Sequence, residues 1–352
     1  MNRRRLLSLL GLGALVGSAG AAWASFGRSR NPYYQGPVTA NFDGLRFTDG
    51  RPVTKGLRDV LRWQTSRRER ELFPESYPTP PADKPPPRVE AGRIAHVGHA
   101  SFLYQLAGLN ILIDPVWSER ASPLRFFGPR RVNPPGIALA DLPPIDVVLI
   151  THNHYDHLDL DTLAALHARF APRMIMPLGN DTIVRSRIPD ARAEAHDWGA
   201  RLQLSDQVAT VMVPSYHWSA RGGFDRRMAL WCSYVLEGPA GKIFHIGDTG
   251  FHDGSLYRQL GEEHGPFDLA VLPIGAYEPR WFMQDNHMNP TEAITVMRSL
   301  RASRALGHHW GTFQLTDEGI ERPIEALKAA LAEAGEPEAR FVPSRPGMVW
   351  TV

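Results

Sequence analysis

Residues that can bind metal ions crowd into one short stretch of this 352-residue chain. Three histidines and two aspartates fall within the eight residues His152-Asn153-His154-Tyr155-Asp156-His157-Leu158-Asp159. Imidazole nitrogens and carboxylate oxygens are the ligands that zinc and similar divalent ions prefer. His152 and His154 can converge on one ion, and Asp156 and His157 on a second, because four ligands so close in sequence are hard to place on one metal. The pattern therefore predicts a centre with two metal ions.

The stretch follows the apolar run 147–150, whose β-branched and aliphatic residues are typical of a buried strand. The ligands then lie at the carboxyl end of that strand, where a rigid scaffold usually presents reactive groups. Three more candidates each come just after an apolar run, namely His217, Asp248 and His309. Asp248 follows a glycine that lets the backbone approach closely, and its two carboxylate oxygens can bridge two cations. His308 competes with His309 for the last position, so the residues alone leave that choice open.

The pattern H-x-H-x-D-H after a strand resembles the metallo-β-lactamase superfamily. That resemblance implies an α/β (α+β) fold, in which two sheets and their flanking helices form a four-layer αββα sandwich. It also implies the two ligand sets, with His309 preferred to His308. One metal would be bound by His152, His154, His217 and Asp248, and the other by Asp156, His157, His309 and the same Asp248. Two divalent ions are the implied cofactors, and zinc is the favoured metal.

Longer segments narrow the resemblance to the N-acylphosphatidylethanolamine-hydrolysing phospholipase D family. Residues 41–47, the loop 114–131 and, most diagnostically, the stretch 272–283 are similar to that family. The resemblance implies hydrolysis of a phosphodiester bond in such a phospholipid, or in another small phosphodiester, by attack of a hydroxide that bridges the metals. Asp248 would fix the spacing of the metals and Asp156 would position the hydroxide. His287 resembles a family histidine near the substrate phosphate.

Two other functions fit the same residues. A lactonase or another small-molecule hydrolase of this fold can share the whole ligand set. A β-lactamase is less well supported, because some members carry a cysteine where this chain has Asp248, and Cys232 lies far from that position. The second alternative is an exported lipid-binding or metal-binding protein without catalysis, against which the intact ligand set argues. His287 also has a plainer interpretation, as a surface residue at the start of a helix over 291–300.

Several neighbours of the candidate ligands are predicted to act indirectly. Asp114 ends a strand and can orient a ligand histidine through a hydrogen bond. Asp159 is predicted to cap a helix over 160–170 rather than to bind metal. His99 resembles a family position near the metals, but a hydrogen-bonded structural histidine is the preferred interpretation. Cys232, the only cysteine, is expected to be a small buried hydrophobic residue.

The chain divides into three predicted parts. Residues 1–24 resemble a twin-arginine export signal, with arginines at 3–5, an apolar segment and the small-residue cleavage site 22–24. Residues 25–90 form an N-terminal extension, with a helix predicted over 57–72 and an extended proline-rich linker over 74–87. Residues 91–352 form the catalytic domain, which begins with an antiparallel meander over 93–114. The protein is therefore expected to be periplasmic, or anchored by an uncleaved leader.

The composition is that of an ordinary globular protein, with 43% hydrophobic and 22% charged residues. Without the three leader arginines, 36 basic residues face 37 acidic ones, so nucleic acid is not an indicated partner. The charged run 67–71 is typical of a solvated helix surface, and peripheral contact with anionic lipid is its functional alternative. Aromatic residues in 126–127 and 277–283 can supply an apolar path for a lipid, and packing within the core is the alternative for each of them. The oligomeric state stays open, with a homodimer as one option.

Overall fold

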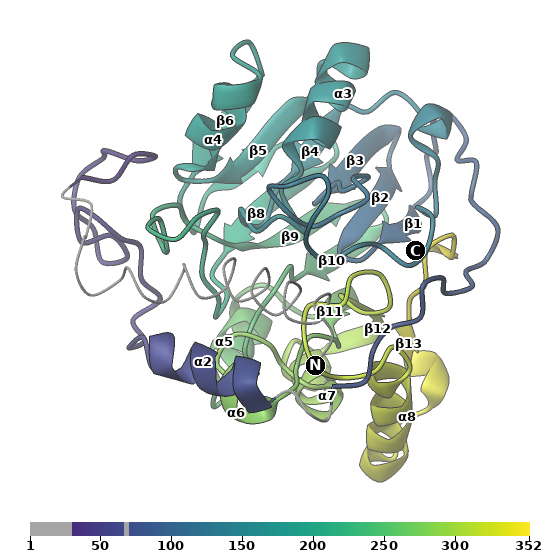
Figure 1. Cartoon of the computed structure of the whole chain (residues 1–352). Coiled ribbons are helices and arrows are strands. Elements are labelled where there is room, and N and C mark those ends of the chain that lie inside the picture. Colours follow the sequence, from purple (N-terminus) through teal and green to yellow (C-terminus); the bar gives the residue numbers. More distant parts are fainter. Residues whose placement is uncertain (1–29, 67–69) are drawn as a thin grey trace.

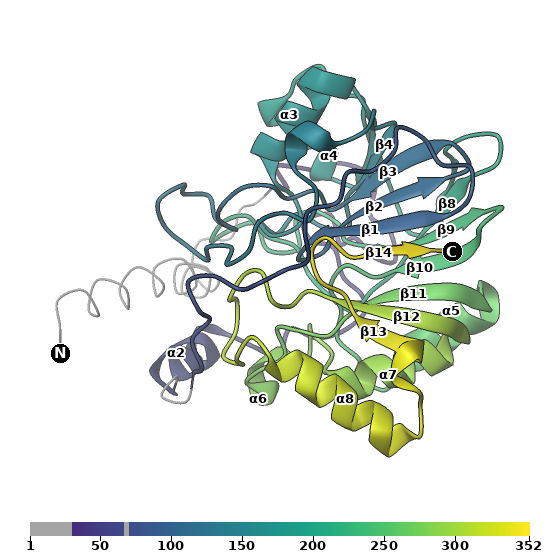
Figure 2. The ribbon, with the colours of Figure 1, turned by 90° about the vertical axis from the view of Figure 1, so that its right-hand side faces the viewer.

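The computed structural model describes residues 30–66 and 70–352, and its centre is a pair of stacked seven-stranded sheets (Figures 1 and 2). The first sheet has the order β14 (Val349–Thr351), β1 (Arg93–Gly98), β2 (Ser101–Leu106), β3 (Leu109–Ile113), β4 (Val147–Leu149), β5 (Arg173–Pro177) and β6 (Ala193–His196). The second has the order β13 (Phe341–Pro343), β12 (Ala302–His308), β11 (Phe267–Pro273), β10 (Gly241–His245), β9 (Ser233–Gly238), β8 (Ala209–Val213) and β7 (Arg201–Gln203).

Helices cover the outer face of each sheet (Figure 2). Helices α3 (Leu160–Phe170) and α4 (Asn180–Arg187) lie on the first sheet, and α5 (Ser255–Glu263), α7 (Pro290–Ser299) and α8 (Arg322–Ala334) lie on the second. Two more helices, α2 (Leu57–Ser66) and α6 (Arg280–Met283), lie against each other beside these layers (Figure 1). The layers therefore follow the order helix, sheet, sheet, helix, and the predicted αββα sandwich is confirmed.

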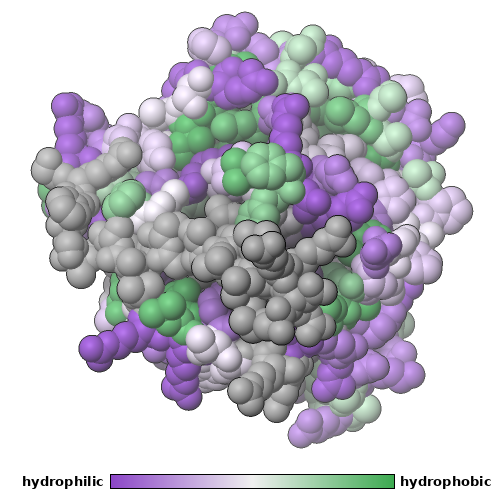
Figure 3. All heavy atoms as spheres, in the orientation of Figure 1, coloured by the Kyte–Doolittle hydropathy of each residue, from purple (hydrophilic) through white to green (hydrophobic). Residues whose placement is uncertain are grey.

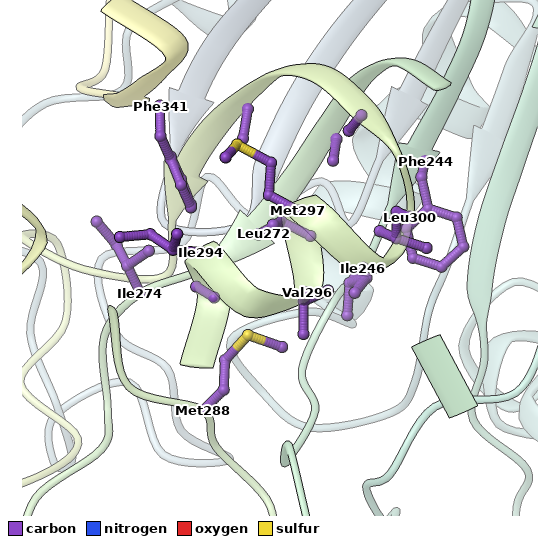
Figure 4. Packing of buried hydrophobic residues seen from close by; sticks show 14 of the residues in the cluster. Phe244, Ile246, Leu272, Ile274, Met288, Ile294, Val296, Met297, Leu300 and Phe341 are labelled. Atoms are coloured by element: carbon purple, nitrogen blue, oxygen red, sulfur yellow. The ribbon is translucent and has the colours of Figure 1, made fainter. Parts of the chain in front are cut away.

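Apolar side chains fill each of the three spaces between the layers. One cluster joins the first sheet to α3 and α4, a second lies between the two sheets, and a third joins the second sheet to α5, α7 and α8. Figure 4 shows part of the third cluster, where Ile294 and Met297 of α7 lie over Leu272 of β11. Burying each such side chain contributes about 1.5–3 kcal/mol, so the packing fixes how the strand ends are placed.

Strand direction explains why distant parts of the sequence meet at one edge. In the first sheet β1 and β3 run in the same direction, because each is antiparallel to β2, and β4 is parallel to β3. In the second sheet β8 and β10 are both antiparallel to β9, while β11 and β12 are parallel to β10. The carboxyl ends of these strands therefore share one edge of each sheet. The candidate metal ligands all follow such ends.

Most predicted elements are confirmed, and one is corrected. The antiparallel meander and the helix over 160–170 are present. The helix predicted over 57–72 ends instead at Ser66, where the hydroxyls of Thr65 and Ser66 bond to carbonyls of the preceding turn. Such local bonds compete with helix propagation. The apolar spacing that predicts this helix also places Leu61 and Leu72 on its apolar face, but both are exposed, whereas Trp63 is buried.

Helix α3 starts as the sequence predicts. The Asp159 carboxylate accepts hydrogen bonds from the backbone N–H groups of Asp161 and Thr162, as an N-cap does. The same side chain accepts a bond of 2.9 Å from the backbone N–H of Ser118. Asp159 is therefore occupied as a cap, and it belongs to none of the candidate metal-binding groups of the described residues. Cys232 is buried, as predicted.

The N-terminal extension is packed against the sheets over its described length. The Asn31 amide donates 2.8 Å bonds to the carbonyls of Leu45 and Met228, and Phe42 and Phe47 pack against Trp231. The proline-rich segment 74–87 contains no helix or strand, and an isolated bridge pairs Asp83 with Ile137. None of the helices in the described part of the chain is both long enough and apolar enough to span a bilayer. The predicted leader 1–24 and residues 67–69 of the charged run lie outside the described residues.

Three histidines are buried between the sheets beneath the edge that carries the ligands. His96 stacks on Phe102 at a centroid distance of 4.4 Å, and the Tyr104 hydroxyl lies 2.8 Å from Nδ1 of His245. Nε2 of His308 donates to the Ile246 carbonyl at 2.8 Å. Burial lowers the pKa of His96 to about 4 and that of His245 to about 3, so both are neutral at pH 7.

We expect the metal-free protein to lose stability as the pH falls below 6.5. An unfolded histidine gains its proton near pH 6.5, whereas folded His96 and His245 stay neutral until about pH 4 and 3, so acid favours the unfolded state. Each such histidine lowers the free energy of unfolding by up to about 1.4 kcal/mol for each pH unit below 6.5. Urea unfolding of chelated protein between pH 8 and 5 measures this slope. His96→Gln should reduce this slope by the amount that corresponds to one proton. A free energy of unfolding that does not change with pH would contradict the expectation.

Candidate metal centre

The first group of candidate ligands comes from β4, β8 and β10. Nδ1 of His154 lies 2.9 Å from Nε2 of His152 and 3.2 Å from Nε2 of His217. One carboxylate oxygen of Asp248, Oδ2, lies 3.6 Å from the same nitrogen of His217 and 3.9 Å from that of His152. Ligands placed tetrahedrally around zinc at its usual bond lengths are separated by about 3.3 Å. These four side chains therefore have the spacing of one tetrahedral metal site.

The second group shares Asp248 with the first. Oδ2 of Asp156 lies 3.3 Å from Nε2 of His309 and 3.5 Å from Nε2 of His157. The other oxygen of Asp248, Oδ1, lies 3.0 Å from Nε2 of His309. The structure thus brings together all seven ligands expected from the sequence. The first group is the predicted set, whereas in the second group His99 joins Asp156, His157 and His309, and Asp248 lies 3.4 Å from Nε2 of His157. His308, the competitor of His309, points instead to the Ile246 carbonyl.

Close backbone contact makes the shared position of Asp248 available. A Cβ atom on Gly247 would lie 2.3 Å from the Thr151 hydroxyl oxygen, which is far inside contact distance. Only glycine therefore lets the end of β10 approach the loop that carries His152 and His154. The Gly247-Asp248 pair is needed for a carboxylate to face both groups.

The donor set fits two divalent cations. His152, His217 and Asp248 are almost completely buried, with exposed fractions of 1%, 1% and 3%. Nε2 of His157 is also buried and has no hydrogen-bond partner. A buried polar atom without a partner is costly, and a cation between these groups removes that cost. Neutral imidazoles with two carboxylates are ligands typical of zinc.

The metal-free centre separates into neutral and protonated histidines. Burial lowers the pKa of His154 to about 4 and holds the pKa values of His152 and His217 well below normal, so their lone pairs are free for a metal at pH 7. Burial also opposes protonation of His309, but Asp248 and Asp156 outweigh it and raise its pKa to about 9. A metal at the second group therefore replaces a proton.

Two residues outside the seven hold the ligands in place. The Asp114 carboxylate lies 2.7 Å from Nδ1 of His157 and accepts a 2.6 Å bond from the Thr151 hydroxyl, so the contact expected for Asp114 is confirmed. Nε2 of His99 lies 2.9 Å from Oδ2 of Asp156, and His99 groups with the second set of ligands. Sequence reasoning treated His99 as structural and undervalued this contact. The position of His99 just after β1, at the same edge as the ligands, was the signal in the sequence that could have indicated this contact.

His287 lies beside both groups. Its ring centroid is 5.4 Å from that of His217 and 5.5 Å from that of His309, and it forms a third potential ligand group with Asp248 and His309. The residue is 9% exposed, so its alternative interpretation as an ordinary surface residue is wrong. His287 immediately precedes α7, which fixes its position.

Comparison with known proteins identifies the class. A family model described as a β-lactamase superfamily domain matches residues 109–310, more than half of the chain. The protein belongs to the metallo-β-lactamase superfamily, and the buried histidine and aspartate groups make it a metal-dependent hydrolase of that superfamily.

More similar relatives cover nearly the whole chain. An uncharacterized protein of Mycobacterium tuberculosis is 36% identical over 340 residues, which are 95% of this chain and 87% of the relative. The N-acyl-phosphatidylethanolamine-hydrolyzing phospholipase D 1 of Caenorhabditis elegans is 32% identical over 335 residues, 91% of this chain and 94% of the relative. The metallo-β-lactamase fold protein YhfI of Bacillus subtilis has a TM-score of 0.51 and 13% identity, over 74% of this chain and all of that one. That last likeness concerns the fold alone.

The shared carboxylate predicts the effect of Asp248→Asn. The amide removes one negative charge and one anionic ligand from both groups, so we expect the variant to fold but to bind one metal ion or fewer per chain. Metal analysis after dialysis measures the content, and circular dichroism checks the fold. Asp253→Asn, at an exposed aspartate in the loop after the site, is the matched control and should bind as many ions as the unaltered protein. Two retained ions in Asp248→Asn would refute the shared position.

Proposed function

We propose that this protein hydrolyses the phosphodiester bond of N-acylphosphatidylethanolamine-type phospholipids, as a phospholipase D does. The observation that carries the proposal is the position of His287, which is buried beside the two ligand groups and follows the family-like stretch 272–283 by four residues. The named relative in Caenorhabditis elegans, which this chain matches over 94% of its length, supports the same substrate class.

The two ions, when bound, would activate a water molecule and neutralise charge on the phosphoryl oxygens. Asp248 sets the separation of the two groups, and Asp156 holds one side of the second. Burial lowers the pKa of His287 to about 4, so its imidazole is neutral near pH 7 and offers one N–H. The His287 ring lies in one group with Asp248 and His309, so the proposed role of its N–H is to contact a phosphoryl oxygen as negative charge builds there.

A network at the start of α7 keeps His287 in this position. One guanidinium nitrogen of Arg280 donates to the His287 carbonyl at 2.9 Å, and another contacts both carboxylate oxygens of Glu292 at 2.9 Å. Glu292 completes a capping box with Asn289. The segment before the helix is therefore fixed from the helix side, which supports a precise role for His287 rather than a mobile one.

Contact with a lipid surface is part of the proposal. Phe126 and Leu124, in the loop 114–131, are 80% and 40% exposed, and Leu72 is 72% exposed. On the face of the molecule that Figure 3 shows, apolar side chains lie in separate groups among polar ones. Tyr277 is buried, and Phe282 stacks on Trp63 at 4.9 Å, so neither is as accessible as Phe126. We therefore assign peripheral membrane contact to the loop 114–131.

Export to the periplasm is proposed from the sequence of residues 1–24 alone. An exported enzyme of this kind would meet phospholipid at the membranes that bound the periplasm.

We expect the zinc-loaded protein to release phosphatidic acid from vesicles that contain N-acylphosphatidylethanolamine. In water enriched in oxygen-18, one label should enter the phosphate, because hydrolysis at phosphorus places the water oxygen there. Mass spectrometry of the lipid products measures both outcomes. Phosphatidylcholine vesicles and a lactone panel are the comparison substrates. Turnover of lactones without any phosphodiester cleavage would replace this proposal with a lactonase, and no turnover of either would favour a binding protein.

We expect His287→Gln to lower kcat for the phosphodiester by about a hundredfold, as loss of one donor to a developing oxyanion usually does. The metal content should stay unchanged, because His287 is outside the two assigned ligand sets. Steady-state kinetics with parallel metal analysis separate the two effects. His264→Gln, at the end of α5, is the control and should retain normal kcat. A His287→Gln variant with normal kcat would remove His287 from the reaction.

A further inference from the structure

We propose that Arg221 is a positioning residue of the metal centre, which holds both ends of the turn that carries three of the ligands. The proposal rests on the two ligand groups and not on the identity of the substrate. Arg221 lies in the segment between His217 and β9, far in sequence from the turn that it contacts. Sequence patterns gave no reason to select it.

The guanidinium bridges two backbone carbonyls. Nη1 of Arg221 donates to the Asn153 carbonyl at 2.9 Å and to the Leu158 carbonyl at 2.8 Å. Between these two residues lie the ligands His154, Asp156 and His157. The turn itself is closed by bonds from the backbone N–H groups of His157 and Leu158 to the His154 carbonyl, at 3.1 and 2.8 Å. One side chain therefore joins the start of the ligand turn to its end.

Tyr155, a residue of the ligand turn, also contacts Arg221. The Arg221 guanidinium lies 3.9 Å from the centroid of the Tyr155 ring, within the range of a cation–π contact. The Tyr155 hydroxyl donates to the Arg221 carbonyl at 2.9 Å. Since Tyr155 stands between the ligands His154 and Asp156, the turn and the arginine hold each other by side chain and by backbone.

The backbone of Arg221 is anchored in turn by a buried carboxylate. Asp225, which is 4% exposed, accepts bonds from the N–H groups of Arg221 and Gly222. The Tyr33 hydroxyl donates to the same carboxylate at 2.7 Å. The N-terminal extension therefore supports Arg221, and through it the ligand turn. This chain of contacts gives the extension a role in the site without touching a metal ligand.

Geometry, rather than charge, explains an arginine at this position. A planar guanidinium can stack on a ring and donate in its plane at the same time, which a lysine ammonium cannot do. A positive charge near two cations repels them, so charge alone would weaken metal binding. The two explanations predict opposite changes in metal affinity when Arg221 is removed. If Arg221 acts by position, its removal weakens metal binding, and if it acts only by charge, its removal strengthens it.

The test compares Arg221→Gln with a matched control, Arg169→Gln. Arg169 also donates to backbone carbonyls, those of Leu139, Ala140 and Leu142, and stacks on an aromatic ring, but it is outside the ligand turn. Both variants are loaded with zinc, and the loss of metal to a competing chelator is measured. Cobalt-substituted samples report the ligand geometry through their visible spectra, and circular dichroism reports the fold.

We expect Arg221→Gln to bind zinc about tenfold or more weakly and to show an altered cobalt spectrum with normal circular dichroism, as loss of a support behind metal ligands usually does. Arg221→Lys, which keeps the charge, should also bind more weakly than the unaltered protein. Arg169→Gln should keep normal metal affinity. Zinc binding in Arg221→Gln that is unchanged or tighter, with a normal cobalt spectrum, would overturn the proposal.

Tyr155→Phe keeps the proposal testable if Arg221→Gln fails to fold. This variant removes only the hydroxyl that holds the Arg221 carbonyl, and we expect a smaller loss of zinc affinity in the same direction. Normal zinc affinity in Tyr155→Phe would then overturn the proposal. No substrate is used in these measurements, so a protein inactive on phosphodiesters would leave their interpretation unchanged.

Discussion

The crowding of imidazoles and carboxylates at one buried edge is the constraint on which the rest of the structure depends. Nitrogen lone pairs of three histidines face one another at 2.9–3.2 Å, and two aspartates are enclosed with them. Such a cluster is unfavourable without positive charge, because buried polar atoms need partners and buried carboxylates need counter-charges. In the metal-free protein protons meet part of that need, at His157 and His309, whose pKa values the neighbouring carboxylates raise. Metal binding and stability of this edge are therefore linked.

The sheets satisfy this constraint by bringing together four strand ends, those of β4, β8, β10 and β12. A surrounding layer of hydrogen bonds holds the ligands in place. Asp114 contacts His157, and His99 contacts Asp156, each from a different strand end of the first sheet. Arg221 reaches the same loop from the segment after β8, which belongs to the second sheet. The site is thus held from both halves of the sandwich, and movement between the two sheets would disturb it at once.

A site residue could be predicted from the sequence where its neighbours in the sequence indicate its role. The ligands in 152–157 are neighbours in sequence, so their spacing alone indicated a metal centre. His217, Asp248 and His309 are candidates because each follows an apolar run, but their assignment to two ligand sets needed the family resemblance. Nothing local separates His309 from His308. The structure makes that distinction by directing His308 to the Ile246 carbonyl. The helix after 57 was predicted too long, since apolar spacing does not reveal that Thr65 and Ser66 would bond back to their own helix. Arg221 escaped prediction because its contacts join residues more than sixty positions apart.

The metal ligands alone do not determine the substrate, because paired cations can activate water for many bonds. Selection of the substrate must come from residues that surround the metal ligands. In this protein these residues belong to two loops that follow strands of different sheets. The loop 114–131 follows β3, and the segment with His287 follows β11. The loop 114–131 also contacts the segment after β12, where Arg131 pairs with Phe313 through a backbone bridge and lies 5.3 Å from its ring centroid. Because neither loop supplies one of the seven ligands, substrate choice can differ between relatives while the metal centre stays the same. Substrate choice in this fold is therefore to be sought in those two loops.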